Sequence, residues 1–253
     1  MKKLQNTIYV KIFMGICKSC SQLLQTTNIN KEEFKQLSQS FMQNAIIGKN
    51  ILYASSPQEL KRYMIFINSM KPYNLVIDGL NVAYAMRTKT EAGSLKPILD
   101  IVEEFHKKGQ RVLVIGRIHM LWWSKKTMKL IQEKADTFFT KNISEDDPFL
   151  LHVTLMSGPQ TYFISRDLMR NLKYKLIDPH LKNVFKTWQL SRQYLYKINK
   201  HKKTVELIEP ISFEMKTQKS EEGWHIPFTC DTKLILPDSY SLPEKWICLK
   251  NKK

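Results

Sequence analysis

The feature that most constrains the fold of this chain is an alternation of short apolar runs with amphipathic stretches from Asn74 onward. The apolar runs include NLVIDGLNV, RVLVIGR, DTFFT and TYFISRD, and amphipathic helices are expected around PILDIVEEFHKKG and SKKTMKLIQEKA. The Val-, Ile- and Leu-rich runs lack polar alternation, which is typical of strands covered on both faces. The alternation therefore predicts an α/β fold with a central parallel sheet and helices on both of its faces.

Helices are also expected on both sides of this region. Asn30 suits an N-cap position ahead of a stretch in which apolar residues recur at helical spacing from Phe34 to Ala45. The sequence SPQE, which starts at Ser56, is a capping box with proline at the first helical position, and it opens a helix to about Ser69. After ISRD we expect a basic helical region, followed by the strand-forming segments TVELIEPISFEM, WHIPF and WICL.

Four aspartates are predicted to lie at one edge of the sheet. Asp78 directly follows the run LVI, and Asp167 follows YFISR, so each is expected at the carboxyl end of a strand. Ligands of open parallel sheets bind at that edge. Asp147 precedes Pro148, which suits a first helical position, so Asp147 is a candidate N-cap with Asp146 beside it on the connecting loop.

The chemistry of such a carboxylate group favours a divalent metal ion. Neighbouring carboxylates stay ionised at pH 7 only if a cation compensates their repulsion, and hard oxygen ligands with room for water select Mg²⁺ or Mn²⁺. One or two such ions can activate water and stabilise the leaving oxygen of a phosphodiester, with Asn81 placed to orient a carboxylate or a water. The alternative is that Asp78 and Asp167 are turn residues and that Asp146 and Asp147 only cap a helix.

The charge of the chain favours a polyanionic partner. Forty Lys and Arg against 23 Asp and Glu give a formal net charge of +17, which indicates nucleic acid first and an anionic membrane surface second. No apolar run approaches the roughly 20 residues needed to cross a bilayer, so a soluble protein is expected. With nucleic acid as the leading partner, no membrane partner is expected. The four cysteines are too few for a disulfide framework in a chain of 253 residues, and a reduced intracellular setting is expected.

The basic residues after Asp167 are candidate RNA contacts. Arg166 and Arg170 flank Asp167 and are expected to contact a phosphate, and Lys173, Lys175 and Lys186 belong to the basic region that follows. Its interleaved aromatic residues are Tyr174, Trp188, Tyr194 and Tyr196, which either stack on unpaired bases or belong to the core.

A zinc site is predicted from both ends of the chain. Cys17 and Cys20 form a CxxC knuckle, and His225 lies near the other end together with Cys230 and Cys248. Three thiolates and one imidazole complete a closed tetrahedral zinc site, and the residues themselves leave either Cys230 or Cys248 as the fourth ligand. Such a site joins the two terminal segments into one module, and its metal contributes to folding.

Several short motifs of the sequence match those of a known family. The chain resembles the catalytic part of protein-only ribonuclease P, nearest to the animal mitochondrial form, through QELKRY, VIDGLNVA, GRIHML, ISEDDPFLL, ISRDLMRN, WHIP and WICL. The resemblance implies a NYN-type, PIN-like Rossmannoid metallonuclease domain over residues 56–205. This domain is inserted in a discontinuous zinc-binding module of residues 1–55 and 206–253.

The resemblance also implies roles for individual residues. It places Asp78, Asp146, Asp147 and Asp167 on the family's Mg²⁺-binding aspartates, and it places Cys17, Cys20, His225 and Cys248 on its zinc ligands, leaving Cys230 outside. The implied reaction is the hydrolytic removal of the 5′ leader from precursor tRNA, which leaves a 5′-phosphate on the mature tRNA. A mitochondrial setting is implied, with a tRNA methyltransferase and a dehydrogenase-like subunit as partners.

One departure from the family pattern affects the expected function. Family members carry an array of pentatricopeptide repeats ahead of the zinc knuckle, so this sequence is expected to be a fragment, a short isoform or a truncated paralogue. Besides the nuclease, two alternatives follow. One is a non-catalytic RNA-binding or regulatory module that keeps the fold, and the other is a broader single-strand nuclease of the PIN-like group.

Overall fold

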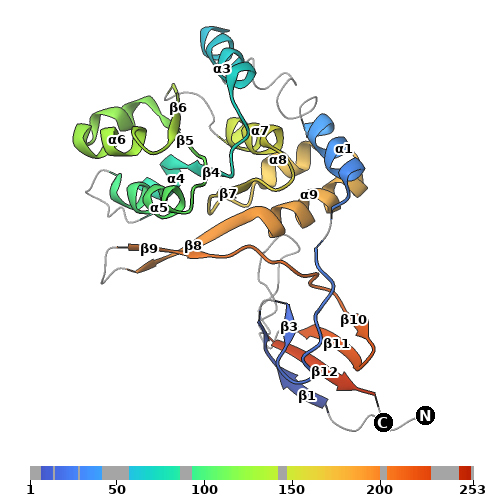
Figure 1. The fold of residues 1–253 in the computed structure, drawn as a ribbon. Coiled ribbons are helices and arrows are strands. Elements are labelled where there is room, and N and C mark those ends of the chain that lie inside the picture. The colour runs from blue at the N-terminus through green and yellow to red at the C-terminus, as the bar shows by residue number, and fades with distance from the viewer. Residues whose placement is uncertain are drawn as a thin grey trace. The chain divides into compact units, whose positions relative to one another are not determined.

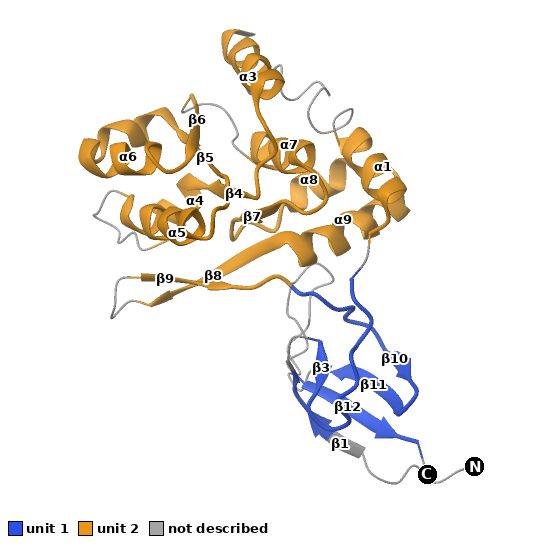
Figure 2. Cartoon of the chain, viewed as in Figure 1, with its two compact units in different colours: residues 1–28, 211–253 blue, residues 29–210 orange. Residues whose placement is uncertain are grey.

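The structure is a computed structural model that describes residues 7–13, 15–27, 29–41, 57–85, 93–141, 147–199, 204–228 and 245–251. The chain divides into two compact units (Figure 2). Unit 1 consists of Met1–Asn28 and Ile211–Lys253, and unit 2 consists of Ile29–Pro210. Each unit is described by itself below.

Unit 2 contains a six-stranded sheet in the order β6-β5-β4-β7-β8-β9 (Figure 1). Its strands are β4 (Leu75–Asp78), β5 (Val112–Arg117), β6 (Asp136–Thr140), β7 (Tyr162–Ile164), β8 (Gln193–Asn199) and β9 (Thr204–Ile208). The first five are parallel, and β9 pairs antiparallel with β8 at the edge. The α/β prediction is confirmed, with one antiparallel strand added to a mainly parallel sheet.

Helices cover both faces of this sheet, as predicted (Figure 1). One layer consists of α4 (Gly79–Ala83), α5 (Lys96–Lys107), η2 (Ile118–Trp122) and α6 (Lys125–Gln132). The other consists of α1 (Lys31–Phe41), α3 (Pro57–Ser69), α7 (Asp147–Ser157), α8 (Arg170–Lys175) and α9 (Pro179–Arg192). Alternate strand residues face the two layers, so that Val76 packs in one hydrophobic cluster and Leu75 and Ile77 pack in the other.

The helix α1 belongs to unit 2, whereas the predicted boundary placed it with the zinc module. Its cap agrees with the sequence, since Asn30 Oδ1 accepts from Glu33 N at 2.7 Å and Glu33 Oε2 accepts from Asn30 N at 3.1 Å. Its apolar stripe is buried in the cluster that contains α7 and α9, and Phe41 stacks on Phe185 with ring centroids 5.9 Å apart. Unit 2 therefore begins at Ile29 and not at residue 56.

The C-terminal boundary of unit 2 also differs from the predicted one. Part of the region expected to be a basic helix is the strand β8, and β9 pairs with it over five residues in a hairpin. Because these backbone hydrogen bonds tie β9 to the α/β sheet, unit 2 extends to Pro210, beyond the predicted end at residue 205.

Unit 1 is built from both ends of the chain. Its four-stranded sheet has the order β1-β12-β11-β10, with β1 (Thr7–Val10), β10 (Gln218–Ser220), β11 (Gly223–Phe228) and β12 (Lys245–Lys250). A small hairpin of β2 (Ile12–Phe13) and β3 (Ile16–Cys17) lies in the same unit. Gly223 has φ +147°, and a Cβ there would lie 1.8 Å from Leu249 O, so only glycine fits where β11 starts beside β12.

Among the helices that the structure describes, none has both the length and the apolar character needed to span a membrane.

Candidate functional site

Asp78 is the last residue of β4, next to the point where the strand order of the sheet reverses. Its carboxylate is 6% exposed and accepts two hydrogen bonds, at Oδ1 from Asn81 N at 3.0 Å and at Oδ2 from Ser165 Oγ at 2.9 Å. The chain turns into α4 at Gly79, where a Cβ would lie 2.8 Å from Ile115 O. A glycine is therefore needed to bring this turn, and the Asp78 carboxylate, close to β5.

Asp167 lies just past β7 in a loop fixed by buried polar side chains. Ser165 Oγ accepts from Asp167 N at 3.0 Å, and Gln193 Nε2 donates to Ser165 O at 2.7 Å and to Asp167 O at 2.8 Å. The amide of Gln193 is held in turn by Gln189 Nε2, 2.8 Å from Gln193 Oε1. Asp167 Oδ1 accepts from the backbone N of Met169, which has φ +52°. The loop conformation is thus determined by α9 and β8 as well as by its own residues.

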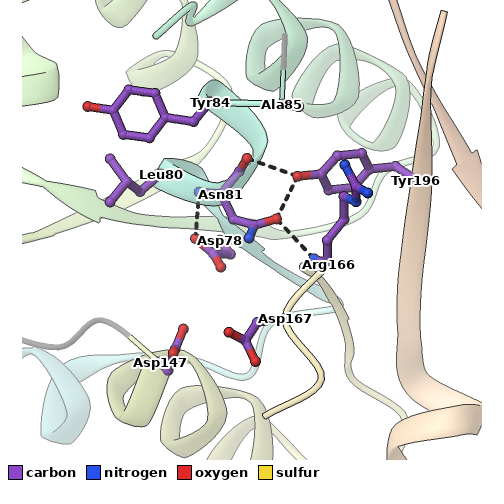
Figure 3. A pocket seen from close by; sticks show the side chains of 9 residues that line it. All are labelled: Asp78, Leu80, Asn81, Tyr84, Ala85, Asp147, Arg166, Asp167 and Tyr196. Atoms are coloured by element: carbon purple, nitrogen blue, oxygen red, sulfur yellow. Dashed lines mark hydrogen bonds between the residues drawn. The ribbon is translucent and has the colours of Figure 1, made fainter. Parts of the chain in front are cut away.

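Asp147 is the first residue of α7 and reaches the same place (Figure 3). An open pocket of about 560 Å³ brings together the three aspartates that the structure describes, and Asp146 lies outside the described residues. The pocket is lined by Asp78, Leu80, Asn81, Tyr84, Ala85, Asp147, Arg166, Asp167 and Tyr196.

The spacing of these carboxylates is looser than that of a closed metal site. Within the described part of the chain, the only tight group of three or more cysteine, histidine or acidic ligands is the cysteine–histidine cluster of unit 1. The aspartate pocket is open to solvent, and a second pocket of about 360 Å³ adjoins it and shares Asp147, Arg166 and Asp167. The arrangement leaves room between the carboxylates for water and for a phosphate group.

Two pocket residues that matter for its geometry are Asn81 and Tyr196. The Tyr196 hydroxyl donates to Asn81 Oδ1 at 2.5 Å and lies 2.9 Å from Asn81 O, and Arg166 N donates to Asn81 Oδ1 at 2.9 Å. The Arg166 guanidinium lies over the Tyr196 ring, 5.6 Å from its centroid. The sequence singled out Asn81 but left Tyr196 as either a base-stacking residue or a core residue. The strand pairing that brings β8 beside β7 is needed to place it here.

The predicted RNA contacts fall into two groups. Arg166 and Arg170 line the pockets at the aspartates, whereas Lys173, Lys175 and Lys186 lie on α8 and α9 and line neither pocket.

The aromatic residues of the basic region after Asp167 differ in how far they are buried. Trp188 and Tyr196 are 1% and 4% exposed and are core residues, Tyr194 packs against Phe105 and Tyr162, and Tyr174 is exposed on α8. Of these four, Tyr174 is the most exposed side chain, at 63%.

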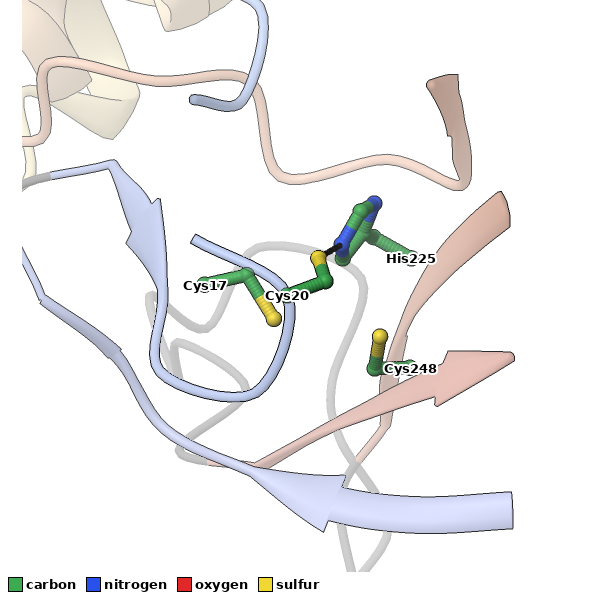
Figure 4. A group of neighbouring side chains, drawn as sticks. All are labelled: Cys17, Cys20, His225 and Cys248. Atoms are coloured by element: carbon green, nitrogen blue, oxygen red, sulfur yellow. Dashed lines mark hydrogen bonds between the residues drawn. The ribbon is translucent and has the colours of Figure 1, made fainter. Parts of the chain in front are cut away.

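The four zinc candidates of unit 1 lie together (Figure 4). Cys17 ends β3, Cys20 follows in a turn, and His225 on β11 is the cross-strand partner of Cys248 on β12. One ligand atom from each side chain lies within 4.8 Å of the others, and Cys20 Sγ is 3.1 Å from His225 Nε2. The cluster joins both ends of the chain, as predicted, with Cys248 as its fourth member; Cys230 lies outside the described residues.

The chemistry of this cluster fits a zinc ion. Tetrahedral zinc bonds of about 2.0–2.3 Å place ligand atoms roughly 3.5–3.8 Å apart, which this cluster reaches with small side-chain shifts. Burial and the neighbouring Cys20 and Cys17 raise the pKa of Cys248 to about 12, and burial lowers the pKa of His225. The His225 Nδ1 atom is buried without a hydrogen-bond partner in the described structure. A cation at the centre compensates for gathering three sulfur ligands away from solvent.

Known proteins are similar to this chain over nearly its whole length. A model of the family described as protein-only RNase P matches residues 13–248. The mitochondrial ribonuclease P catalytic subunit of Mus musculus is 36% identical over 242 residues, which is 94% of this chain and 41% of that protein. The subunit of the same name from Rattus norvegicus is 36% identical over 94% of this chain and 40% of its own length. The chain thus spans about two fifths of the length of these relatives.

A solved structure is similar in fold. The nuclear proteinaceous RNase P 2 of A. thaliana superimposes with a TM-score of 0.67 over 98% of this chain and 50% of that one, at 18% sequence identity. At this identity the likeness concerns the fold alone. The match of a family model to nearly the whole chain confirms the resemblance seen in the motifs, and the chain belongs to the protein-only RNase P family.

Proposed function

We propose that this chain is a metal-dependent endoribonuclease that hydrolyses the phosphodiester at the 5′ leader junction of precursor tRNA and leaves a 5′-phosphate. The observation that carries the proposal is the convergence of Asp78, Asp147 and Asp167, from three separate segments, on one open pocket at the switch point of the sheet. The relatives named as ribonuclease P catalytic subunits supply the substrate class.

The pocket residues suit one or two Mg²⁺ or Mn²⁺ ions. The three carboxylates offer hard oxygen ligands in an open space, and we propose that Asp146, next to Asp147 in the sequence, completes the set. A bound divalent ion would supply an activated water and balance the charge of the phosphate. Ser165 and the backbone of Asn81 hold the Asp78 carboxylate in place for this role.

The cationic side chains around the pocket have a separate task. Arg166 and Arg170 line the pockets on either side of Asp167, so we propose that they bind the phosphates next to the cleaved bond. Lys173, Lys175 and Lys186 are more distant along α8 and α9, and we assign them to the RNA backbone farther from the cut.

The cysteine–histidine cluster is proposed to bind one structural zinc ion. Four buried or half-buried protein ligands leave no open position for a substrate, which is typical of structural sites. The ion would stabilise unit 1, whose strands come from opposite ends of the chain.

The setting of the activity is proposed from the relatives. Their name supports a mitochondrial location and precursor tRNA as the substrate. The family resemblance further suggests a tRNA methyltransferase and a dehydrogenase-like subunit as partners in the reaction.

The decisive experiment compares the chain with single substitutions in a precursor-tRNA cleavage assay that contains Mg²⁺ and the candidate partners. Asp147→Asn and Asp167→Asn are expected to reduce the rate by more than roughly 100-fold, since even residues that only support a ligand typically contribute 10- to 100-fold. Asp178→Asn is the matched control, because Asp178 caps α9 by accepting from His180 N and asparagine caps equally well.

Three outcomes would contradict the proposal. Equal cleavage by all variants would exclude the aspartates from the reaction. Binding of precursor tRNA without cleavage would favour a non-catalytic RNA-binding module. Cleavage of single-stranded RNA regardless of tRNA structure would indicate a broader nuclease.

A further inference from the structure

We infer that Tyr196 is a positioning residue of the aspartate pocket and that it acts by fixing the carboxamide of Asn81. This inference rests on the proposed function and adds a residue from a different strand to the site. Tyr196 lies on β8, two strands away from Asp78 on β4, and its side chain is 4% exposed.

The first support is the hydrogen bonding of Asn81. Its Oδ1 atom accepts from the Tyr196 hydroxyl at 2.5 Å and from Arg166 N at 2.9 Å. A carboxamide accepts hydrogen bonds through its oxygen and donates them through its NH2 group. Two donors that bind the oxygen therefore determine which way the amide points. The nitrogen is thereby turned away from Arg166 and toward Asp78, as Figure 3 shows. There it can donate to a carboxylate, to a water or to a phosphate oxygen of the substrate.

The second support is that the hydroxyl of Tyr196 keeps its proton. Burial and the negative charge of Asp78 raise the pKa of Tyr196 above its usual value. The neutral hydroxyl remains a donor throughout the pH range in which the pocket carboxylates are ionised. The direction of the hydrogen bond, and with it the orientation of the Asn81 amide, is therefore stable.

The third support is that the packing alone does not require a tyrosine. The ring of Tyr196 belongs to the cluster formed by α4, α5 and α6, where a phenylalanine would fill the same space. Only the hydroxyl reaches Asn81 O and Oδ1. The ring also lies beneath the Arg166 guanidinium, so one side chain touches two pocket residues from different segments.

The test is a double-mutant cycle in the full chain, measured as single-turnover cleavage of precursor tRNA at saturating Mg²⁺ and with the candidate partners present. Tyr196→Phe is expected to slow cleavage about tenfold with KM nearly unchanged, because it removes one hydrogen bond and keeps the ring. Asn81→Ala is expected to slow it further. In the Asn81→Ala background, Tyr196→Phe should change the rate less than about twofold, since the group it orients is gone.

Tyr162→Phe is the matched control, because Tyr162 undergoes the same chemical change in the same hydrophobic cluster and does not line the pocket. Its cleavage rate should equal that of the unmodified chain. If the effects of Tyr196→Phe and Asn81→Ala on the activation free energy are fully additive, the two residues act independently, and the inference is overturned. Unchanged cleavage by Tyr196→Phe would overturn it as well.

A second measurement is independent of activity. The side-chain amide resonances of Asn81, assigned by their loss in Asn81→Ala, should shift in ¹⁵N-labelled Tyr196→Phe and stay in place in Tyr162→Phe. Absence of the shift would overturn the positioning role even if the chain cleaves RNA. Failure of the unmodified chain to cleave precursor tRNA, with the shift present, would count against the proposed function and leave the positioning of Asn81 standing.

Discussion

Two polar side chains of α3 hold the backbone at the end of β6. Glu59 on α3 is 2% exposed, and its Oε1 accepts from Lys141 N at 2.5 Å. Arg62, one turn later, donates to Phe139 O. Together they hold the backbone at the end of β6, just ahead of the segment that contains Asp146. The motif QELKRY, which contains both residues, therefore has a structural role at the end of β6.

A buried histidine on α7 gives a prediction for the effect of pH on stability. His152 on α7 is 1% exposed, its Nδ1 lies 2.6 Å from the Tyr63 hydroxyl, and burial lowers its pKa from 6.5 to about 4. Between these values the unfolded chain binds the proton more readily, so the free energy of unfolding falls as the pH drops from 6.5 to 4. Through this histidine, the free energy of unfolding at pH 5 is about 2 kcal/mol lower than at neutral pH.

Urea denaturation of the chain and of His152→Gln at pH 7 and pH 5 measures this contribution. The variant is expected to be less stable at pH 7, because it disturbs a buried hydrogen bond, and to lose less further stability at pH 5. An equal loss on acidification in both proteins would assign the pH dependence to other groups.

At the scale of elements, the helix α1 supports the α/β unit from outside its sheet. Phe34, Leu37 and Phe41 face α7 and α9, and Leu37 and Phe41 are fully buried. The spacing of these residues indicated a helix, but the side chains they meet include Phe185 on α9, about 150 residues later in the sequence. The helix therefore contributes to the hydrophobic core that α7 and α9 share.

Leu37→Ala is expected to destabilise unit 2 by about 2–5 kcal/mol, because it leaves a cavity in this core. The exposed Lys35→Ala on the same helix is the control and should change stability by less than about 0.5 kcal/mol. Hydrogen exchange of the β4 and β5 amides measures the effect. Lost protection in β11 and β12 with unchanged β4 and β5 would place α1 with the zinc unit instead.

For the whole molecule, the cysteine–histidine cluster links the two ends of the chain. The residues Cys17 and Cys248 are separated by almost the entire sequence and are brought together by β1 pairing with β12 and by the hairpin of β2 and β3. The small core of unit 1 includes Val10, Leu24 and Trp246 besides these cysteines. The part of unit 1 that the structure describes has few buried apolar residues, so we expect the proposed zinc ion to contribute to its stability.

Removal of zinc is therefore expected to unfold unit 1 and to leave unit 2 folded. Elemental analysis should find about one zinc per chain, and a chelator should abolish amide protection in β11 and β12 while β4 and β5 stay protected. Cys248→Ala should lose the ion, and Cys230→Ala is the matched control that should keep it. Full zinc retention by Cys248→Ala, with loss in Cys230→Ala, would assign the fourth position to Cys230.

The sequence by itself determined the features that depend on local pattern. These are the alternation of strands and helices, the N-cap of α1, and the placement of Asp78 and Asp167 at the ends of strands. Local patterns are readable because side-chain periodicity and capping involve residues only a few positions apart. The residues alone indicated Cys17, Cys20 and His225 as zinc candidates, and the family motifs favoured Cys248 over Cys230 as the fourth. All four of these side chains lie in the cluster.

Only the tertiary structure decided which distant segments meet. The contact of Tyr196 with Asn81, the support of Asp167 by Gln193, and the membership of α1 and β9 in unit 2 all follow from strand order and helix packing. No short stretch of sequence encodes these neighbours, because each contact joins residues from separate elements. The same physical reason explains why the acidic residues of the pocket and Asn81 could be recognised from their own positions, whereas Ser165 and Gln193, which hold Asp78 and the Asp167 loop, could not.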